Sequence, residues 1–236
     1  MKIAVQISGE FRYLSACWQS FERYILKGFP RSDVDVFLHT WRCDTPTDSL
    51  SDHGKGLALF QPRGYLLESY ADRQDLQNLP RAYSMFYSIQ QANEQRKNYE
   101  RLLEISYDLV IRYRTDLQIQ EPLYPKIQKE IQSRKPFLWI PKSTCVSVSD
   151  GPVEDSICDW FAIGTPDAMD VYCGTFATWL PVALPIVPES MLAMQLKSRG
   201  IQEETNLKRY ELAVYLERGQ TAAKQSLKSP EGSEER

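Results

Sequence analysis

Short apolar runs alternate with longer amphipathic segments along the first half of the chain. Runs rich in β-branched and aromatic residues predict strands at Lys2–Ile7, Asp33–Trp41 and Tyr107–Ile119. Apolar positions that recur every three or four residues predict helices at Leu14–Leu26 and Ser84–Ile105. Because strands and helices alternate, we predict an α/β protein whose sheet contains parallel strands.

The second half continues this pattern. The segments "PFLWIP" and "DWFAIG" predict strands, and "DAMDVYCGTFATWL" and "PESMLAMQLKSRGI" predict helices. The segment "GLALFQPRGYLLES" has room for a third short strand, and the polar residues Arg42–Lys55 before it predict a surface loop. The last residues lack apolar periodicity. We therefore predict one domain over residues 1–218 and a disordered tail over residues 219–236.

In the helix predicted at Ser84–Ile105, five residues form the apolar face. They are Met85, Ile89, Ala92, Tyr99 and Leu103. We expect this face to pack beside the strand predicted at Tyr107–Ile119, which follows the helix directly.

Composition and charge exclude several classes of function. The net charge of −3 gives no reason to expect nucleic acid or an anionic membrane as the main partner. The five cysteines are dispersed without a C-x-x-C pair, and the chain has two histidines, which argues against a disulfide framework or a zinc centre. The N-terminal apolar run is too short for a signal peptide or an anchor. We predict a cytoplasmic protein without a transmembrane segment, and a peripheral contact with a membrane stays open.

Polar side chains gather where the predicted strands end, and ligands bind at the carboxyl ends of parallel strands. The first strand is followed by Ser8, Gly9 and Arg12, and the second ends at His39-Thr40-Trp41. Gly9 is either a turn residue or a place where the backbone approaches a ligand closely. The segment "ISGEFR" is neither G-x-G-x-x-G nor a P-loop, so it supports neither a dinucleotide site nor a Walker-type ATPase.

The third predicted strand carries the charged residues Arg112, Arg114 and Asp116 toward its end. Alternation along a strand puts these three side chains on one face. They form either an internal row of salt bridges or a site in which guanidinium groups bind a diphosphate and Asp116 binds a divalent metal.

Two further carboxylates are candidates for chemistry. Asp159 precedes an aromatic run, and it either caps a turn or accepts hydrogen bonds from sugar hydroxyls. Glu189 stands in the first turn of a predicted helix, where it either complements the helix dipole or serves as a general base.

Taken in order, the segments "ISGEFR", "VFLHTW", "YSIQQANE", "YDLVIRYRTDL" and "DWFAIGTPDAMDVY" resemble a group of bacterial and viral GT-A-like glycosyltransferases of surface-glycan synthesis, such as lipopolysaccharide or capsule. The resemblance covers roughly residues 2–205. It implies a GT-A-like nucleotide-diphospho-sugar transferase fold, with a single mixed, mostly parallel sheet flanked by helices. It also implies a nucleotide-sugar donor and a glycan or glycolipid acceptor.

The resemblance assigns roles residue by residue. Ser8, Gly9 and Arg12 would line the nucleotide, while Arg112 and Arg114 would hold phosphates. Arg114-Thr115-Asp116 stands where GT-A enzymes carry the D-x-D motif that binds Mn²⁺ or Mg²⁺. Arg114 replaces the first Asp of that motif, which leaves Asp116 as a lone metal ligand or a donor-binding residue.

The leading hypothesis is a glycosyltransferase with Asp159 and Glu189 as its catalytic carboxylates. The first alternative is a non-catalytic relative that binds a nucleotide sugar or a partner, and the Arg114 replacement keeps it open. The second is a nucleotidyl- or phosphotransferase, against which the lack of a Lys/Gly-rich phosphate loop counts.

Overall fold

Parallel strands form the centre of the molecule. The computed structural model describes residues 1–11, 13–42, 50–133, 135–142, 157–180, 188–202, 206–210 and 214–216. Within these residues, a seven-stranded sheet has the order β3-β2-β1-β4-β7-β6-β8. All neighbouring pairs are parallel except those of β7, which runs antiparallel to β4 and β6. The prediction of an α/β protein with a mostly parallel sheet is confirmed.

The strands are short, and their bounds follow the apolar runs of the sequence. They are β1 Ile3–Ser8, β2 Val34–Arg42, β3 Gly64–Ser69, β4 Leu109–Tyr113, β6 Leu138–Pro141, β7 Ala162–Gly164 and β8 Leu207–Tyr210. Two further strands, β5 Leu117–Ile119 and β9 Val214–Leu216, form a separate antiparallel pair.

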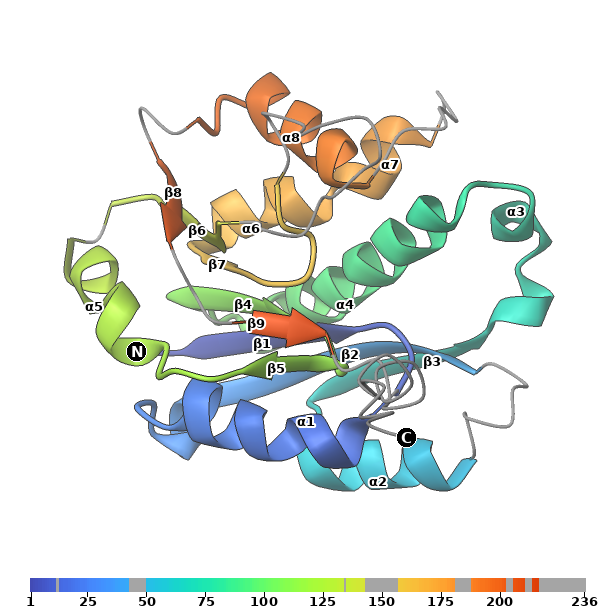
Figure 1. Cartoon of the computed structure of the whole chain (residues 1–236), viewed down its shortest axis with the longest axis horizontal. Helices are drawn as coiled ribbons and strands as arrows, with labels where there is room; N and C mark the ends of the chain where they lie inside the picture. The colour runs from blue at the N-terminus through green and yellow to red at the C-terminus, as the bar shows by residue number, and fades with distance from the viewer. Residues whose placement is uncertain are drawn as a thin grey trace, which may run out of the picture.

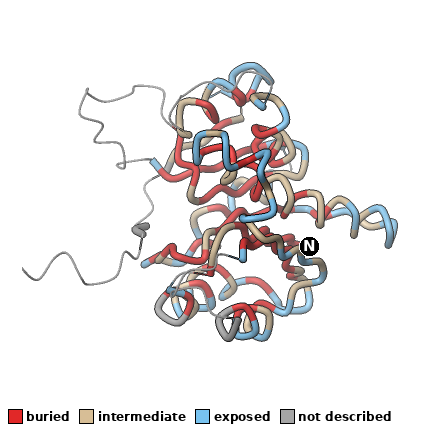
Figure 2. The backbone as a smooth tube through the Cα atoms, turned by 90° about the vertical axis from the view of Figure 1, so that its right-hand side faces the viewer, coloured by how far each residue is buried: buried red, intermediate tan, exposed pale blue. Residues whose placement is uncertain are grey.

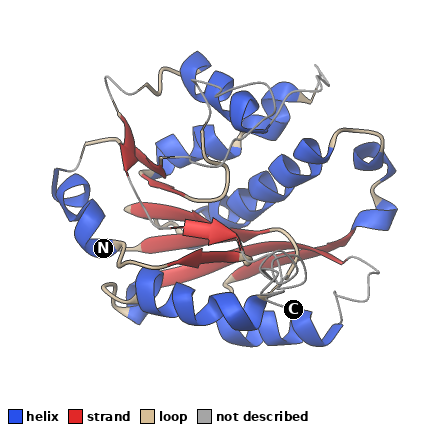
Figure 3. Cartoon of the chain, viewed as in Figure 1, coloured by secondary structure: helices blue, strands red, loops and turns tan. Residues whose placement is uncertain are grey.

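Helices cover both faces of the main sheet, as Figures 1 and 3 show. On one face lie α1 Leu14–Ser20, a π-helix at Phe21–Leu26, α2 Leu50–Phe60 and α5 Tyr124–Ser133. On the other face lie α4 Arg81–Leu103, α6 Pro166–Cys173, α7 Thr175–Trp179 and α8 Pro188–Ser198. The short α3 Gln74–Gln77 and two 3-10 turns, Arg31–Asp33 and Tyr70–Asp72, lie in connections.

The alternating side chains of β1 divide the core into two halves. Ile3, Val5 and Ile7 pack with the α1 side, whereas Ala4 packs with the α4 side. Every residue of β1 is buried, as expected of a central strand that is covered on both faces. Figure 2 shows buried residues gathered in the interior of the molecule and exposed residues on its outer turns.

The helix predicted at Ser84–Ile105 is present as α4, Arg81–Leu103, but its predicted packing is partly wrong. Ile89 and Ala92 are buried as expected, but Leu103 is 49% exposed. The helix packs mainly on β1, β2 and β3 rather than beside β4. The reason is that α4 connects β3 to β4, and β2 and β1 lie between these two strands in the sheet.

Three other sequence predictions need correction. The single strand predicted at Tyr107–Ile119 divides into β4 and β5, with a turn at Thr115-Asp116 between them. The loop predicted for Arg42–Lys55 is wrong at its end, since α2 begins at Leu50. The helix predicted over "DAMDVYCGTFATWL" is interrupted at Gly174. The tail predicted for residues 219–236 lies outside the described residues.

Among the residues with a described structure, no helix has both the length and the apolar character needed to cross a bilayer.

Candidate functional site

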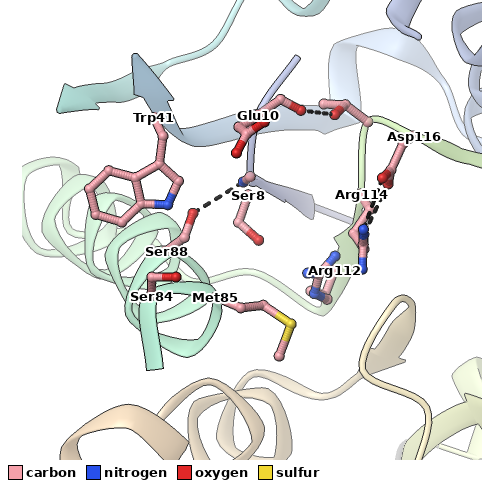
Figure 4. A pocket seen from close by; sticks show the side chains of 11 residues that line it. Ser8, Glu10, Trp41, Ser84, Met85, Ser88, Arg112, Arg114 and Asp116 are labelled. Atoms are coloured by element: carbon pink, nitrogen blue, oxygen red, sulfur yellow. Dashed lines mark hydrogen bonds and ion pairs between the residues drawn. The ribbon is translucent and has the colours of Figure 1, made fainter. Parts of the chain in front are cut away.

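A polar pocket opens at the carboxyl ends of β1, β2 and β4, with the first turns of α4 as its side wall (Figure 4). Its volume is about 140 Å³. The lining residues come from these four elements and the segments after β1 and β4. They are Ser8, Gly9, Glu10, Trp41, Ser84, Met85, Ser88, Arg112, Arg114, Thr115 and Asp116. The pocket therefore lies at the edge of the sheet where parallel strands place ligands.

Gly9 is the turn that ends β1. Its φ of 112° lies in the left-handed half of the backbone map, which residues with a Cβ rarely adopt. Its N–H is used internally, at 3.2 Å from the His39 carbonyl and 3.1 Å from Ser88 Oγ. Of the two interpretations of Gly9, the structure favours the turn residue.

Ser8 contributes a different signal at the same turn. It is 4% exposed, and its Oγ has no hydrogen-bond partner among the described residues. Buried hydroxyls are normally hydrogen-bonded, so an unpaired one at a pocket wall points to a ligand. Arg12, the third residue predicted here, lies outside the described residues.

Arg112 is a buried arginine with incomplete hydrogen bonding. It lies in β4 and is 1% exposed, and one guanidinium nitrogen (Nη1) donates to the Trp160 carbonyl at 3.0 Å. Its Nε has no partner in the described part of the chain. Burial lowers the pKa of Arg112, which means that the charged form lacks full compensation and would be stabilised by an anion.

Arg114 and Asp116 form a two-pronged ion pair. Arg114 Nε lies 2.9 Å from Asp116 Oδ1, and Nη2 lies 2.9 Å from Oδ2. Burial is the largest influence and opposes the charge of Arg114, but the bond and the charge of Asp116, together with the charge of Asp159, outweigh it and raise the pKa of Arg114. The salt-bridge interpretation of this strand end is thus correct for Arg114 and Asp116, while Arg112 stays outside the pair.

The donor set does not fit a divalent cation. Both oxygens of Asp116 accept hydrogen bonds from Arg114. Among the described residues, no group of three or more His, Cys, Asp or Glu side chains is placed to hold a metal ion. The Mn²⁺ or Mg²⁺ expected from the D-x-D position accordingly has no support from the geometry of the described residues.

Asp159 and Glu189 are not among the residues that line the pocket. Asp159 is 3% exposed, and its Oδ1 has no partner among the described residues. Burial raises the pKa of Asp159 to about 6, against the opposing charge of Arg114 and with a smaller contribution from Glu189. Glu189 is partly buried in the first turn of α8. A carboxyl group that titrates near neutral pH can both accept and donate a proton.

The structure brings most of the predicted residues together. Ser8, Gly9, Arg112, Arg114 and Asp116 line one pocket although they come from separate segments. Asp159 interacts electrostatically with both arginines, and Glu189 with Asp159.

The α4 wall of the pocket was missed from sequence. Ser84 and Ser88 stand four residues apart on one side of the helix, and Met85 lies between them. Serines in an amphipathic helix look like solvated positions, so only their placement opposite a strand end reveals them. Trp41 belongs to a strand end that the sequence did single out, and it stacks on Tyr87 with ring centroids 5.6 Å apart.

The chain matches no protein-family model, and a comparison with curated proteins finds no match. The fold and pocket define an α/β protein with an arginine-bearing polar pocket at the carboxyl edge of its sheet.

Proposed function

We propose that this protein is a glycosyltransferase that moves a sugar from a nucleotide-diphosphate donor to a glycan or lipid-linked acceptor. One observation carries the proposal. Two buried hydrogen-bonding atoms, Ser8 Oγ and Arg112 Nε, lack partners among the described residues, and both residues line the pocket at the strand ends. A phosphate group offers the acceptor oxygens and the negative charge that these atoms lack.

The size of the pocket limits what it holds. A cavity of about 150 Å³ holds one benzene ring, so the 140 Å³ pocket is too small for a whole nucleotide sugar and suits one ring with the phosphate oxygens next to it. We infer that it binds one segment of the donor, with the remainder outside. The strand order, with a single antiparallel strand between β4 and β6, is compatible with the GT-A architecture of the resemblance.

The arginines would stabilise the leaving diphosphate. Arg112 Nε has no acceptor among the described residues, and Arg114 can exchange its carboxylate partner for phosphate oxygens. Positive charge held in a partly dry site stabilises the charge that develops on a leaving group. In this scheme Arg114 supplies the neutralisation that a metal supplies at a D-x-D motif.

Asp159 is our candidate for proton transfer. Its raised pKa, about 6, leaves it mostly ionised at pH 7, and because it does not line the donor pocket, the acceptor hydroxyl that gives it a proton would approach from outside that pocket. Glu189 would modulate this group through its charge, because it contributes to the raised pKa.

The test is a thermal-shift panel with UDP-, GDP- and dTDP-sugars, each with and without Mn²⁺, and with CMP-sugars, which carry one phosphate instead of two, for comparison. We expect one donor class to raise the melting temperature in the absence of Mn²⁺. The Arg114→Gln variant should lose this shift. The matched control is Arg63→Gln, because Arg63 also pairs with a carboxylate, Asp35 at 2.8 Å, but does not line the pocket.

The outcomes separate the proposal from its alternative. Stabilisation with turnover of the donor supports a transferase, and stabilisation without turnover supports the non-catalytic nucleotide-sugar-binding relative. If no nucleotide sugar stabilises the wild-type chain, the proposal is wrong.

A further inference from the structure

A chain of hydrogen bonds runs from the pocket wall into the protein. Ser88 Oγ, on α4, lies 2.7 Å from Nδ1 of His39, on β2. His39 Nε2 lies 2.9 Å from Oε2 of Glu68, on β3. His39 and Ser88 are 0% and 1% exposed. Glu68 is 22% exposed, so the relay is buried at His39 and Ser88, and Ser88 forms its end at the pocket.

The charges around the relay determine where its protons lie. Burial would raise the pKa of Glu68, but hydrogen bonds from His39, Tyr87 and Arg73 outweigh it and lower the pKa. Glu68 is therefore an ionised carboxylate, which only accepts hydrogen bonds, so His39 Nε2 must carry a hydrogen. Burial lowers the pKa of His39, which makes its ring neutral and leaves Nδ1 as an acceptor.

This protonation pattern fixes the polarity of Ser88. Its O–H must point to His39 Nδ1, and one of its two lone pairs accepts the Gly9 N–H at 3.1 Å. A hydroxyl group has one hydrogen and two lone pairs. Toward a ligand, Ser88 can then only accept a hydrogen bond.

The two ends of the pocket consequently select different chemical groups. At one end Arg112 and Arg114 donate hydrogen bonds and suit phosphate oxygens. At the other end, Figure 4 places Ser88 beside Trp41, whose indole nitrogen lies on the side of Ser88. A phosphate oxygen cannot donate to Ser88, whereas a hydroxyl group can.

We infer that Ser88 is a specificity-determining residue that accepts a hydrogen bond from a ring hydroxyl of the donor's sugar, with its polarity set by His39 and Glu68. The inference rests on the proposed function and names the group that the pocket selects. The pocket volume of 140 Å³ suits one such ring.

The first test compares matched ligand pairs by calorimetry: UDP-glucose with UDP, GDP-mannose with GDP, and dTDP-glucose with dTDP. For the pair that binds the wild-type chain, Ser88→Ala should weaken the sugar nucleotide about tenfold, as expected for one net hydrogen bond. The nucleoside diphosphate should bind within about twofold of wild type. Ser198→Ala is the matched control, because the Ser198 hydroxyl also donates to a carbonyl one turn back, that of Gln195 at 2.8 Å, but Ser198 does not line the pocket.

A second variant reverses the polarity without removing Ser88. Arg73 donates to Glu68 Oε1 at 3.0 Å, and the Tyr87 hydroxyl donates to Oε2 at 2.9 Å. In Glu68→Gln the amide oxygen would keep the bond from the charged Arg73, which is the stronger of the two. The amide nitrogen would then face His39 and donate its second hydrogen to Tyr87, whose hydroxyl would turn to accept. The nitrogen would donate to His39 Nε2, moving the ring hydrogen to Nδ1. Ser88 would then turn its O–H toward the pocket and could no longer accept the bond from the sugar hydroxyl in the same way. The sugar nucleotide should therefore bind about tenfold more weakly, as in Ser88→Ala.

The tautomer can be observed directly, because the chain has two histidines and its ¹⁵N-histidine spectrum is simple. We expect His39 in the Nε2–H form in wild type and in the Nδ1–H form in Glu68→Gln. If Ser88→Ala weakens both members of a pair equally, or neither, the inference is wrong while the proposed function stands. The same holds if the His39 tautomer changes in Glu68→Gln and the affinity for the sugar nucleotide does not. If no pair binds the wild-type chain, the proposed function fails and the inference fails with it.

Discussion

Replacing Asp116 by Asn separates the two roles that this carboxylate can have. In the structure both of its oxygens bond Arg114 at 2.9 Å, and the two side chains are 12% and 24% exposed. Asn keeps one acceptor oxygen and loses the charge and the second acceptor. A charge-assisted hydrogen bond contributes about 1.5–3 kcal/mol when buried, and partial exposure reduces this, so we expect a loss of about 1–2 kcal/mol in the free energy of unfolding.

For a chain of this length, such a loss lowers the melting temperature by about 2–8 °C. Urea denaturation measures the free energy directly. The control is Glu94→Gln, which breaks an ion pair with Lys97 on the surface of α4, with side chains 36% and 39% exposed. Exposed pairs of this kind contribute about 0–0.5 kcal/mol.

The same variant tests how the pocket binds phosphate. Without the Asp116 charge, Arg114 is released toward the ligand, so UDP or the nucleoside diphosphate of the preferred donor should bind about tenfold tighter, equal to about 1.4 kcal/mol. Calorimetry with and without Mn²⁺ measures this. If Asp116→Asn left the free energy of unfolding unchanged, the Arg114–Asp116 ion pair would not stabilise the fold, and our expectation would be wrong. A loss of affinity seen only with Mn²⁺ would make Asp116 a metal ligand and refute our interpretation of the site.

Two further predictions concern Asp159 and the core. The pKa of Asp159 rises from 3.8 to about 6 on folding because the side chain is buried, so the folded state binds its proton more tightly and stability falls as pH rises from about 4 to about 6. Asp159→Asn should flatten this slope and raise stability at pH 7 by up to about 3 kcal/mol, and denaturation curves across this pH range would contradict us if the slope persisted. Ile89→Ala should cost about 2–4 kcal/mol because Ile89 is 1% exposed in the core, whereas Leu103→Ala on the same helix, at a position 49% exposed, should cost less than about 0.5 kcal/mol. Equal effects of these two substitutions in urea denaturation would show that this face of α4 is assigned wrongly.

Local pattern in the sequence was enough to predict the central layer of this protein. The apolar runs of β1 and β2 and the periodicity of α4 depend on neighbouring residues, so they can be recognised without the rest of the fold. The location of the pocket could also be predicted from the charged residues at the strand ends, because parallel strands bring their carboxyl ends to one edge of the sheet. Ser8, Gly9, Arg112, Arg114 and Asp116 were selected on that ground, and they line one pocket.

Other features depended on contacts that no local pattern contains. The turn at Thr115-Asp116 interrupts a run that alternates like one strand, and β5 leaves the main sheet to pair with β9. The helical start of α2 was hidden by polar residues that are equally common in loops.

The partners of the charged and polar groups were decided by the tertiary structure alone. His39 meets Ser88 from 49 positions away and Glu68 from 29 positions away. Asp159 acquires a pKa of about 6 because surrounding elements exclude water from it, and Arg112 Nε is buried where no other described residue offers it an acceptor. The sequence determines which polar groups lie near the strand ends. Hydrogen bonding and desolvation, however, act over a few ångströms in space rather than along the chain. Only the packed chain therefore decides which of these groups pair with one another and which can bind a ligand.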